Sequence, residues 1–211
     1  VAQVSAFKVT MLASGSKGNS ALISTGKQNF LIDVGISCRK LTTRLNEVGL
    51  RVEDLDAIFI THEHSDHIKG IGVMARKYNV PICGTAETIN AMLRSSSIGR
   101  IPEGLFHFVK PDHAFMINDI EVEPFSISHD AANPVCYTFK ADQKKIGYAT
   151  DLGKYDDYIV AGVDGIGNVI TAKDGSRFVL DQQSDTQTFE ILKNNKNFEK
   201  KCSKNKTNKE K

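Results

Sequence analysis

The chain has no long hydrophobic run and few cysteines. No segment approaches the run of about 18 apolar residues that a membrane-spanning helix needs, and the first residues lack the charged-then-apolar pattern of a secretory signal. These absences predict a soluble, cytoplasmic protein that has no membrane partner. The four cysteines lack paired spacing, so we expect reduced thiols rather than disulfides or a cysteine-ligated metal; they are Cys38, Cys83, Cys136 and Cys202.

The composition fits one globular domain with a basic end. A chain of 211 residues that is 40% hydrophobic can bury one sizeable core. The net charge of +2 arises from residues 193–211, which hold eight lysines against two glutamates. We expect this segment to be a disordered tail whose attraction to nucleic acid is weak and sensitive to salt.

Histidine is scarce, yet three of the six histidines lie in one heptapeptide. Residues 61–67 read THEHSDH and follow an apolar stretch. Residues two apart in an extended segment face the same side, so His62 and His64 can bind one cation. Asp66 and His67, at the next turn, can reach a second one. Imidazole and carboxylate ligands without cysteine favour a catalytic zinc, manganese or iron site, the alternative being a His-rich polar loop.

The hydrophobic pattern alternates between strands and helices. A helix after the metal motif must end near Asn79, because Pro81 follows, and Thr85 is a suitable N-cap for another helix to about Arg94. Each candidate ligand lies at or just beyond a strand end, where a sheet can hold it rigidly. A first helix is predicted over 38–48, and strands over 7–12, 21–24, 29–33, 55–60, 106–109, 114–117, 120–125, 136–140, 145–149, 169–171, 177–180 and 188–192.

The motif H-x-H-x-D-H, between a hydrophobic strand and a helix, resembles the metallo-β-lactamase superfamily of hydrolases. Three further residues extend the resemblance in family order: Asp33 at the end of an early strand, His129 after a later one, and Asp151 after the next. The loop 11–20 (MLASGSKGNS) looks most like that of the YycJ-like cytoplasmic hydrolases, which are regarded as DNA exonucleases.

The resemblance implies an α/β fold, a four-layer αβ/βα sandwich that is incomplete at its C-terminal end. The resemblance covers about residues 7–160, and we expect residues 1–160 to form one metallo-β-lactamase-like domain. Short strands in 161–192 have no place in the family pattern, and 193–211 is the basic tail. No histidine follows His129, although the family has a last His that completes the second metal site. A divergent or truncated ending is therefore as plausible as a genuine variant one.

The family's mechanism uses two metals per chain, Zn²⁺ or Mn²⁺. Because the last His is missing, this chain could instead bind only one. A metal-bound hydroxide would attack a phosphodiester of DNA. Alternatives are a hydrolase of small esters, thioesters or lactams, and an inactive domain. In the family arrangement, a first metal would be held by His62, His64 and His129, and a second by Asp66 and His67, with Asp151 bridging the two. The resemblance also implies catalytic roles for Asp66 and Asp151. Asp33 would lie behind the ligand loop and orient it.

The Ser/Gly/Asn loop offers a possible phosphate contact. Ser16, Lys17 and Asn19 could bind substrate, since two glycines let the backbone approach closely, although an ordinary strand-connecting turn explains the same residues. Glu63 is expected to face solvent or to form a salt bridge. The sequence makes no prediction of the oligomeric state.

Overall fold

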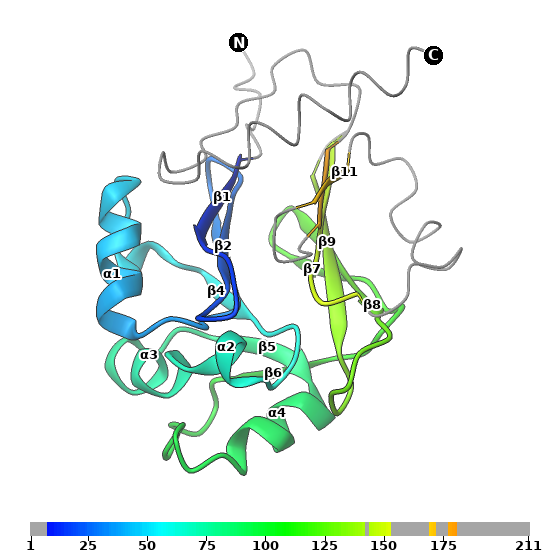
Figure 1. Ribbon diagram of the computed structural model, residues 1–211. Coiled ribbons are helices and arrows are strands. Elements are labelled where there is room, and N and C mark those ends of the chain that lie inside the picture. The colour runs from blue at the N-terminus through cyan, green and yellow to red at the C-terminus, as the bar shows by residue number, and fades with distance from the viewer. Residues whose placement is uncertain (1–7, 142–143, 153–168, 172–176, 181–211) are drawn as a thin grey trace.

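Two six-stranded sheets lie face to face in the computed structural model, which describes residues 8–141, 144–152, 169–171 and 177–180 (Figure 1). The first sheet has the order β1 (Lys8–Ala13), β2 (Ser20–Ser24), β3 (Asn29–Ile32), β4 (Ala57–Phe59), β5 (Ile82–Thr85) and β6 (Phe106–Val109). The second has the order β11 (Val169–Thr171), β12 (Arg177–Leu180), β10 (Lys144–Ala149), β9 (Val135–Ala141), β8 (Ile120–Ser126) and β7 (Phe115–Ile117).

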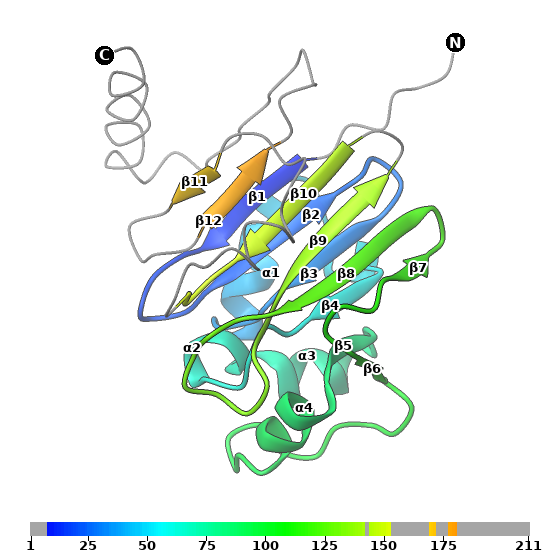
Figure 2. The same cartoon turned by 90° about the vertical axis from the view of Figure 1, so that its right-hand side faces the viewer.

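The helices cover the outer face of the first sheet, as the two views together show (Figures 1 and 2). They are α1 (Cys38–Glu47), the 3₁₀ turn η1 (Val52–Asp54), α2 (Ser65–Ile68), α3 (Ile71–Tyr78) and α4 (Ala86–Leu93). The described residues thus form a helix layer, a sheet and a second sheet. This confirms the α/β sandwich for the described residues, whereas the fourth layer of the expected αβ/βα sandwich cannot be assigned within them.

Alternation along the strands builds two apolar layers. On β3, Leu31 packs against the helices, while Phe30 and Ile32 face the second sheet, because successive strand residues point to opposite faces. Phe59 of β4 contacts Tyr137 of β9 at a ring-centroid distance of 5.1 Å. Aromatic packing between the sheets therefore forms a rigid base behind the strand ends.

The helix predicted after the metal motif is two short helices. The chain breaks at Gly70, whose N–H donates to the carbonyl of Val34 at 2.8 Å. A Cβ on Gly70 would lie 2.3 Å from the carbonyl oxygen of Ile36, so only glycine allows this approach. The predicted end is confirmed, with Asn79 in the left-handed conformation after α3. A tertiary contact, which periodicity does not reveal, divides the helix.

The other described elements follow the predicted pattern closely. The predicted hairpin of 169–171 and 177–180 is confirmed, and its second strand also pairs with β10. Strand β5 was not predicted, because its four residues, ICGT, are too short to show a period. The strand at 188–192 and the tail at 193–211 lie outside the described residues.

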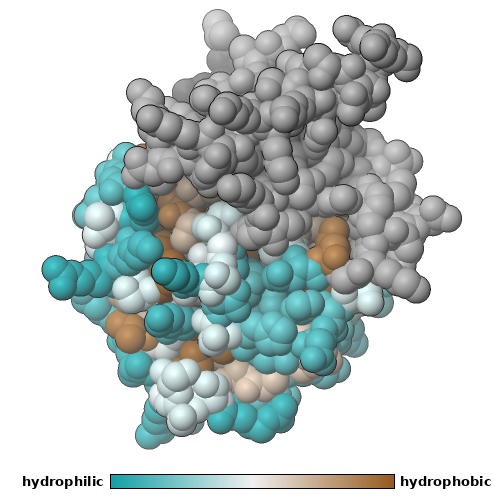
Figure 3. All heavy atoms as spheres, viewed as in Figure 1, coloured by the Kyte–Doolittle hydropathy of each residue, from teal (hydrophilic) through white to brown (hydrophobic). Residues whose placement is uncertain are grey.

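The coloured part of the face in Figure 3 is mainly hydrophilic, with small separate apolar areas. Among the described residues, the large hydrophobic side chains that are exposed are Val73, Leu93, Phe108 and Met116. None of the helices in the described part of the chain has the length and apolar character needed to cross a membrane.

Candidate metal centre

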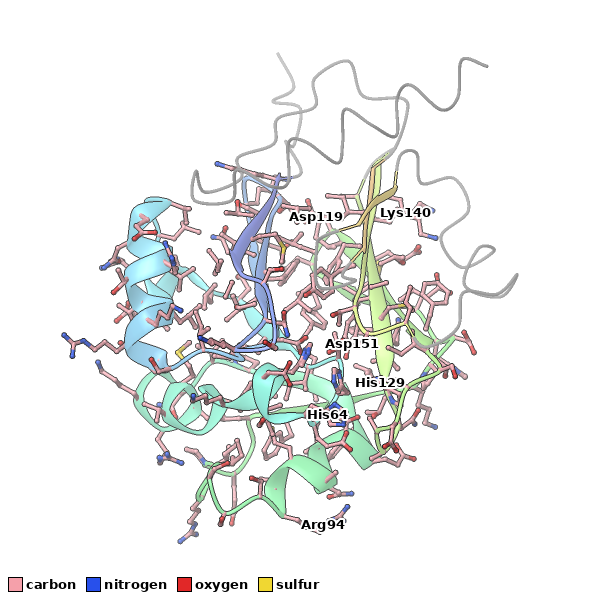
Figure 4. All side chains as sticks on the ribbon, viewed as in Figure 1. His64, Arg94, Asp119, His129, Lys140 and Asp151 are labelled. Atoms are coloured by element: carbon pink, nitrogen blue, oxygen red, sulfur yellow. The ribbon has the colours of Figure 1, made fainter. Side chains whose placement is uncertain are left out.

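Four strand ends bring the predicted ligands to one end of the sandwich. β3 and β4 are parallel, so Asp33, which follows β3, meets the 61–67 segment, which follows β4. β8 and β10 run in the same direction, each antiparallel to β9 between them, and lead to His129 and Asp151. Figure 4 shows His129 and Asp151 directed towards the same region as His64, far from Asp119 and Lys140 at the opposite end.

The first ligand group consists of three imidazoles. His62, His64 and His129 each offer a ligand atom, and these atoms all lie within 4.8 Å of one another. His129 Nε2 lies 3.2 Å from His64 Nδ1. Burial, assisted by the neighbouring imidazoles of His67 and His64, lowers the pKa of His62 to about 2, so His62 is neutral at pH 7. A neutral imidazole is the form that binds a cation.

The second ligand group shares His62 with the first. His62, His67 and Asp151 also have ligand atoms within 4.8 Å of one another. Asp151 Oδ2 lies 2.9 Å from His67 Nε2 and 3.8 Å from His62 Nε2. The hydrogen bond from His67 lowers the pKa of Asp151 to about 2, against the opposing effect of burial. Asp66 stands at the rim of this group, with its Oδ2 atom 3.6 Å from His67 Nε2.

Asp33 organises the ligand segment from behind. Its buried carboxylate accepts hydrogen bonds from Thr61 N–H at 2.8 Å and from Thr61 Oγ1 at 2.7 Å, and it lies 2.7 Å from His67 Nδ1. Burial alone would lower the pKa of His67, but the charge of Asp33 and hydrogen bonds to Asp151 and Asp33 raise it to about 10. A cation that binds His67 Nε2 must therefore displace a proton.

Thr61 connects this carboxylate to both ligand groups, a role that the sequence interpretation did not assign to it. Thr61 Oγ1 lies 3.0 Å from His62 Nδ1 while it donates to Asp33. Because the hydroxyl proton is used in the bond to Asp33, His62 Nδ1–H donates to Thr61 Oγ1. The unprotonated Nε2 of His62 then faces the centre. The sequence signal that could have identified this role is the position of Thr61, directly before the first His of the motif and after a buried strand.

Two acidic residues of the centre have unusual backbone conformations. Asp33 has φ 58° and Asp151 has φ 52°, both in the left-handed region that Asp tolerates better than most residues. Each residue follows the end of a strand, and its carboxylate lies beside the imidazole of His67. Such conformations persist where surrounding contacts enforce them, and here they allow strand ends to serve as ligand positions.

The Ser/Gly/Asn loop lies at the same end of the sandwich. β2 is antiparallel to β3, so the start of β2 and the loop before it lie beside the end of β3. Ser16 and Lys17 are exposed, whereas Asn19 is only 4% exposed. The side-chain amide of Asn19 faces Asp66 and His67, with Nδ2 3.1 Å from Asp66 Oδ2. Ser16 and Lys17 are therefore open to solvent, whereas Asn19 faces the centre itself.

Glu63 differs from its expected role, because it joins two ligand-bearing segments. Its Oε1 atom accepts a 2.8 Å hydrogen bond from the N–H of Ala132, three residues after His129. Its Oε2 atom is buried and has no hydrogen-bond partner among the described residues. The side chain of Glu63 therefore connects the segment of His62 and His64 to the loop of His129.

We expect Glu63→Ala to weaken binding of the first cation by about 10- to 100-fold, the effect of losing a group that orients ligands. Glu63→Gln keeps an Oε1 acceptor and should stay close to the wild type. The measurement is a competition titration with a chromophoric chelator, with exposed Ser65→Ala as a control. Equal affinities in the Glu63→Ala variant and the wild type would show that the connection has no influence on the ligands.

The donor atoms of the centre fit divalent cation binding. The Nε2 atom of His62 is buried, has no hydrogen-bond partner among the described residues, and lies between the two ligand groups. A buried polar atom without a partner is costly unless something binds it. Nitrogen and carboxylate ligands without sulfur suit zinc or manganese.

Comparison with known proteins agrees with this geometry. The family model of the β-lactamase superfamily domain matches residues 28–175. The chain is 43% identical over 162 residues to exodeoxyribonuclease WalJ of Streptococcus pneumoniae, covering 75% of this chain and 60% of the relative. It is 38% identical over 156 residues to exodeoxyribonuclease YycJ of Bacillus anthracis, covering 74% of this chain and 58% of the relative.

Solved structures show the same fold at low sequence identity. A metallo-β-lactamase of Cronobacter sakazakii superposes with a TM-score of 0.57 at 14% identity, covering 68% of this chain and 56% of that one. A B3 metallo-β-lactamase with an active-site glutamic acid gives a TM-score of 0.55 at 16% identity, covering 74% and 67%. With the family model matching more than half of its residues, the chain belongs to the metallo-β-lactamase superfamily.

Proposed function

We propose that this chain is a metal-dependent phosphodiesterase that degrades DNA as an exonuclease. The observation that carries the proposal is a pair of adjacent ligand groups that meet at His62, with His64 and His129 on one side and His67 and Asp151 on the other. Adjacent cations are a common arrangement in enzymes that hydrolyse phosphate esters. The exodeoxyribonuclease names of two relatives support DNA as the substrate, and because the chain spans 60% and 58% of their lengths, the activity is a proposal for this chain.

Some residues of the centre would hold cations, and others would orient the residues that hold them. The imidazoles of the first group would hold one Zn²⁺ or Mn²⁺, and His67 with Asp66 would hold the second, with Asp151 between the two. When bound, such cations lower the pKa of a shared water and neutralise charge on phosphate oxygens. Asp33 keeps His67 in the orientation that presents Nε2 to the centre.

Substrate approach is open from the side of the Ser/Gly/Asn loop. The ammonium group of Lys17 and the hydroxyl of Ser16 are exposed at the rim, where they can meet a phosphate of the DNA backbone. Positive charge at this point would attract a polyanion without reading its sequence. We therefore assign substrate contact to Ser16 and Lys17.

The number of cations depends on how the second group is completed. The described residues supply His67, Asp151 and the shared His62 to this group, with Asp66 at its rim, and no histidine follows His129 in the sequence. We propose two cations per chain, with the second held more weakly than the first. Elemental analysis after dialysis against zinc or manganese measures this directly, and one cation per chain would support a mononuclear centre.

We expect the purified chain to shorten linear DNA from its ends when zinc or manganese is present. A chelator should abolish the activity and added metal should restore it, because the proposed chemistry needs the cation. The assay compares end-labelled linear DNA with closed circular DNA, RNA, a thioester and a β-lactam. Hydrolysis of the thioester or lactam alone would support the small-molecule alternative, and a metal-loaded protein that hydrolyses none of them would support an inactive domain.

A further inference from the structure

Asn19 is fastened by its backbone to two other parts of the centre. Its N–H donates to the carbonyl of Asp66 at 2.7 Å, and its carbonyl accepts from Gly35 N–H at 2.8 Å. A Cβ on Gly35 would lie 1.6 Å from the Asp66 carbonyl oxygen and 2.5 Å from Asn19 N. The loop, the segment after β3 and the start of α2 are therefore packed together so closely that Asn19 cannot shift independently of Asp66.

The side-chain amide of Asn19 has a defined orientation. Its Oδ1 atom accepts a 2.9 Å hydrogen bond from Gly15 N–H, so the amide must place Nδ2 on the opposite side. Nδ2 then donates to Asp66 Oδ2 at 3.1 Å. Nδ2 also lies 3.1 Å from His67 Nε2, but that nitrogen is 2.9 Å from Asp151 Oδ2 and is itself a candidate cation ligand. The hydrogen bond of this amide to a carboxylate is therefore the one to Asp66.

Asp66 has few other constraints on its carboxylate. It lies in the first turn of α2, a helix of four residues, and its side chain is partly exposed. Within the described ranges, no other group donates a hydrogen bond to this carboxylate. A partly exposed carboxylate loses rotamer freedom when it binds a cation, and a donor that already holds it reduces that loss.

We propose that Asn19 is a positioning residue that holds the Asp66 carboxylate towards the second cation. The inference rests on the proposed two-cation centre. It gives Asn19 a role different from the exposed Ser16 and Lys17 of the same loop, since the buried amide acts through Asp66. A cation that binds His67 Nε2 leaves the Asn19 hydrogen bond to Asp66 intact, because the amide nitrogen has two protons.

The test is a double-mutant cycle with zinc affinity as the readout. Zinc binding to the full chain is measured by chelator competition for the wild type, Asn19→Ala, Asp66→Ala and the double variant. We expect Asn19→Ala to weaken the second zinc by about 10- to 100-fold and to leave the first unchanged. In the Asp66→Ala background, the same change should have an effect of less than about 3-fold, because residues that act as a unit are not additive.

Equal losses in the two backgrounds, or an unchanged second affinity in Asn19→Ala, would overturn the inference. Asn90→Ala, the same substitution at an exposed position on α4, is the matched control, and thermal unfolding of the metal-free variants identifies a loss of folding. A crystal structure of the zinc-loaded wild type needs no variant. We expect Asn19 Nδ2 within about 3.2 Å of an Asp66 oxygen, and a separation beyond hydrogen-bonding distance contradicts the inference. A chain that binds two zinc ions without degrading DNA would refute only the proposed function.

Discussion

Replacing Asp33 by alanine is expected to lower the free energy of unfolding of the metal-free protein by about 3–5 kcal/mol, the cost of removing one partner from a buried ionic contact. Asp33 is fully buried, and its carboxylate holds the N–H and hydroxyl of Thr61 as well as the imidazole of His67. All three groups would stay buried without this acceptor. Urea denaturation measures the effect, and zinc affinity should fall in the same variant.

The matched control is Asn118→Ala, at an exposed hairpin residue with φ 53°. It reports the cost of placing alanine in the left-handed region, about 1–2 kcal/mol, without a buried acceptor being lost. The difference between the two variants isolates the hydrogen-bond network of Asp33. Equal destabilisation in both would mean that the carboxylate adds nothing beyond its backbone conformation.

Replacing Asp151 by alanine is expected to reduce DNA hydrolysis by at least about 10³-fold. Asp151 Oδ2 lies 2.9 Å from His67 Nε2 and 3.8 Å from His62 Nε2, so the variant would lose the carboxylate that is proposed to help to hold the cations. Several kcal/mol of charge stabilisation depend on such cations, and about 4 kcal/mol corresponds to 10³ in rate. The measurement compares single-turnover rates on end-labelled DNA at saturating metal.

Asp130→Ala provides the control for this prediction. Asp130 also carries a carboxylate at this end of the sandwich, directly after His129, but it is exposed and belongs to neither ligand group. Its rate should stay within about 3-fold of the wild type, as expected for a surface change. A rate in Asp151→Ala that matches that of Asp130→Ala would exclude Asp151 from the reacting centre.

The strands and most helices could be predicted because their signals are local. Alternation marks the strands, and Gly49, with φ 79°, follows α1 where the sequence predicted its end. The division between α2 and α3 had no such signal, because Gly70 breaks the helix through its contact with Val34 and Ile36. Local periodicity cannot report a contact between segments more than 30 residues apart.

The sequence by itself determined the kind of chemistry and the main fold. The heptapeptide at 61–67 provides imidazoles and carboxylate without sulfur, and the strand before it predicts that these residues sit at the edge of a sheet. The four motifs in order were enough to indicate the metallo-β-lactamase superfamily, which the family model then confirmed.

Only the tertiary structure decided how the ligands are held. Asn19 meets Asp66 across 47 residues of sequence, and Glu63 meets Ala132 across 69. Asn, Glu and Thr are common in loops, so their type alone does not distinguish a solvent-facing side chain from a partner of a metal ligand. Hydrogen bonds act over about 3 Å in space and are independent of sequence distance, so the folded sheets had to bring these partners together before their roles could be seen.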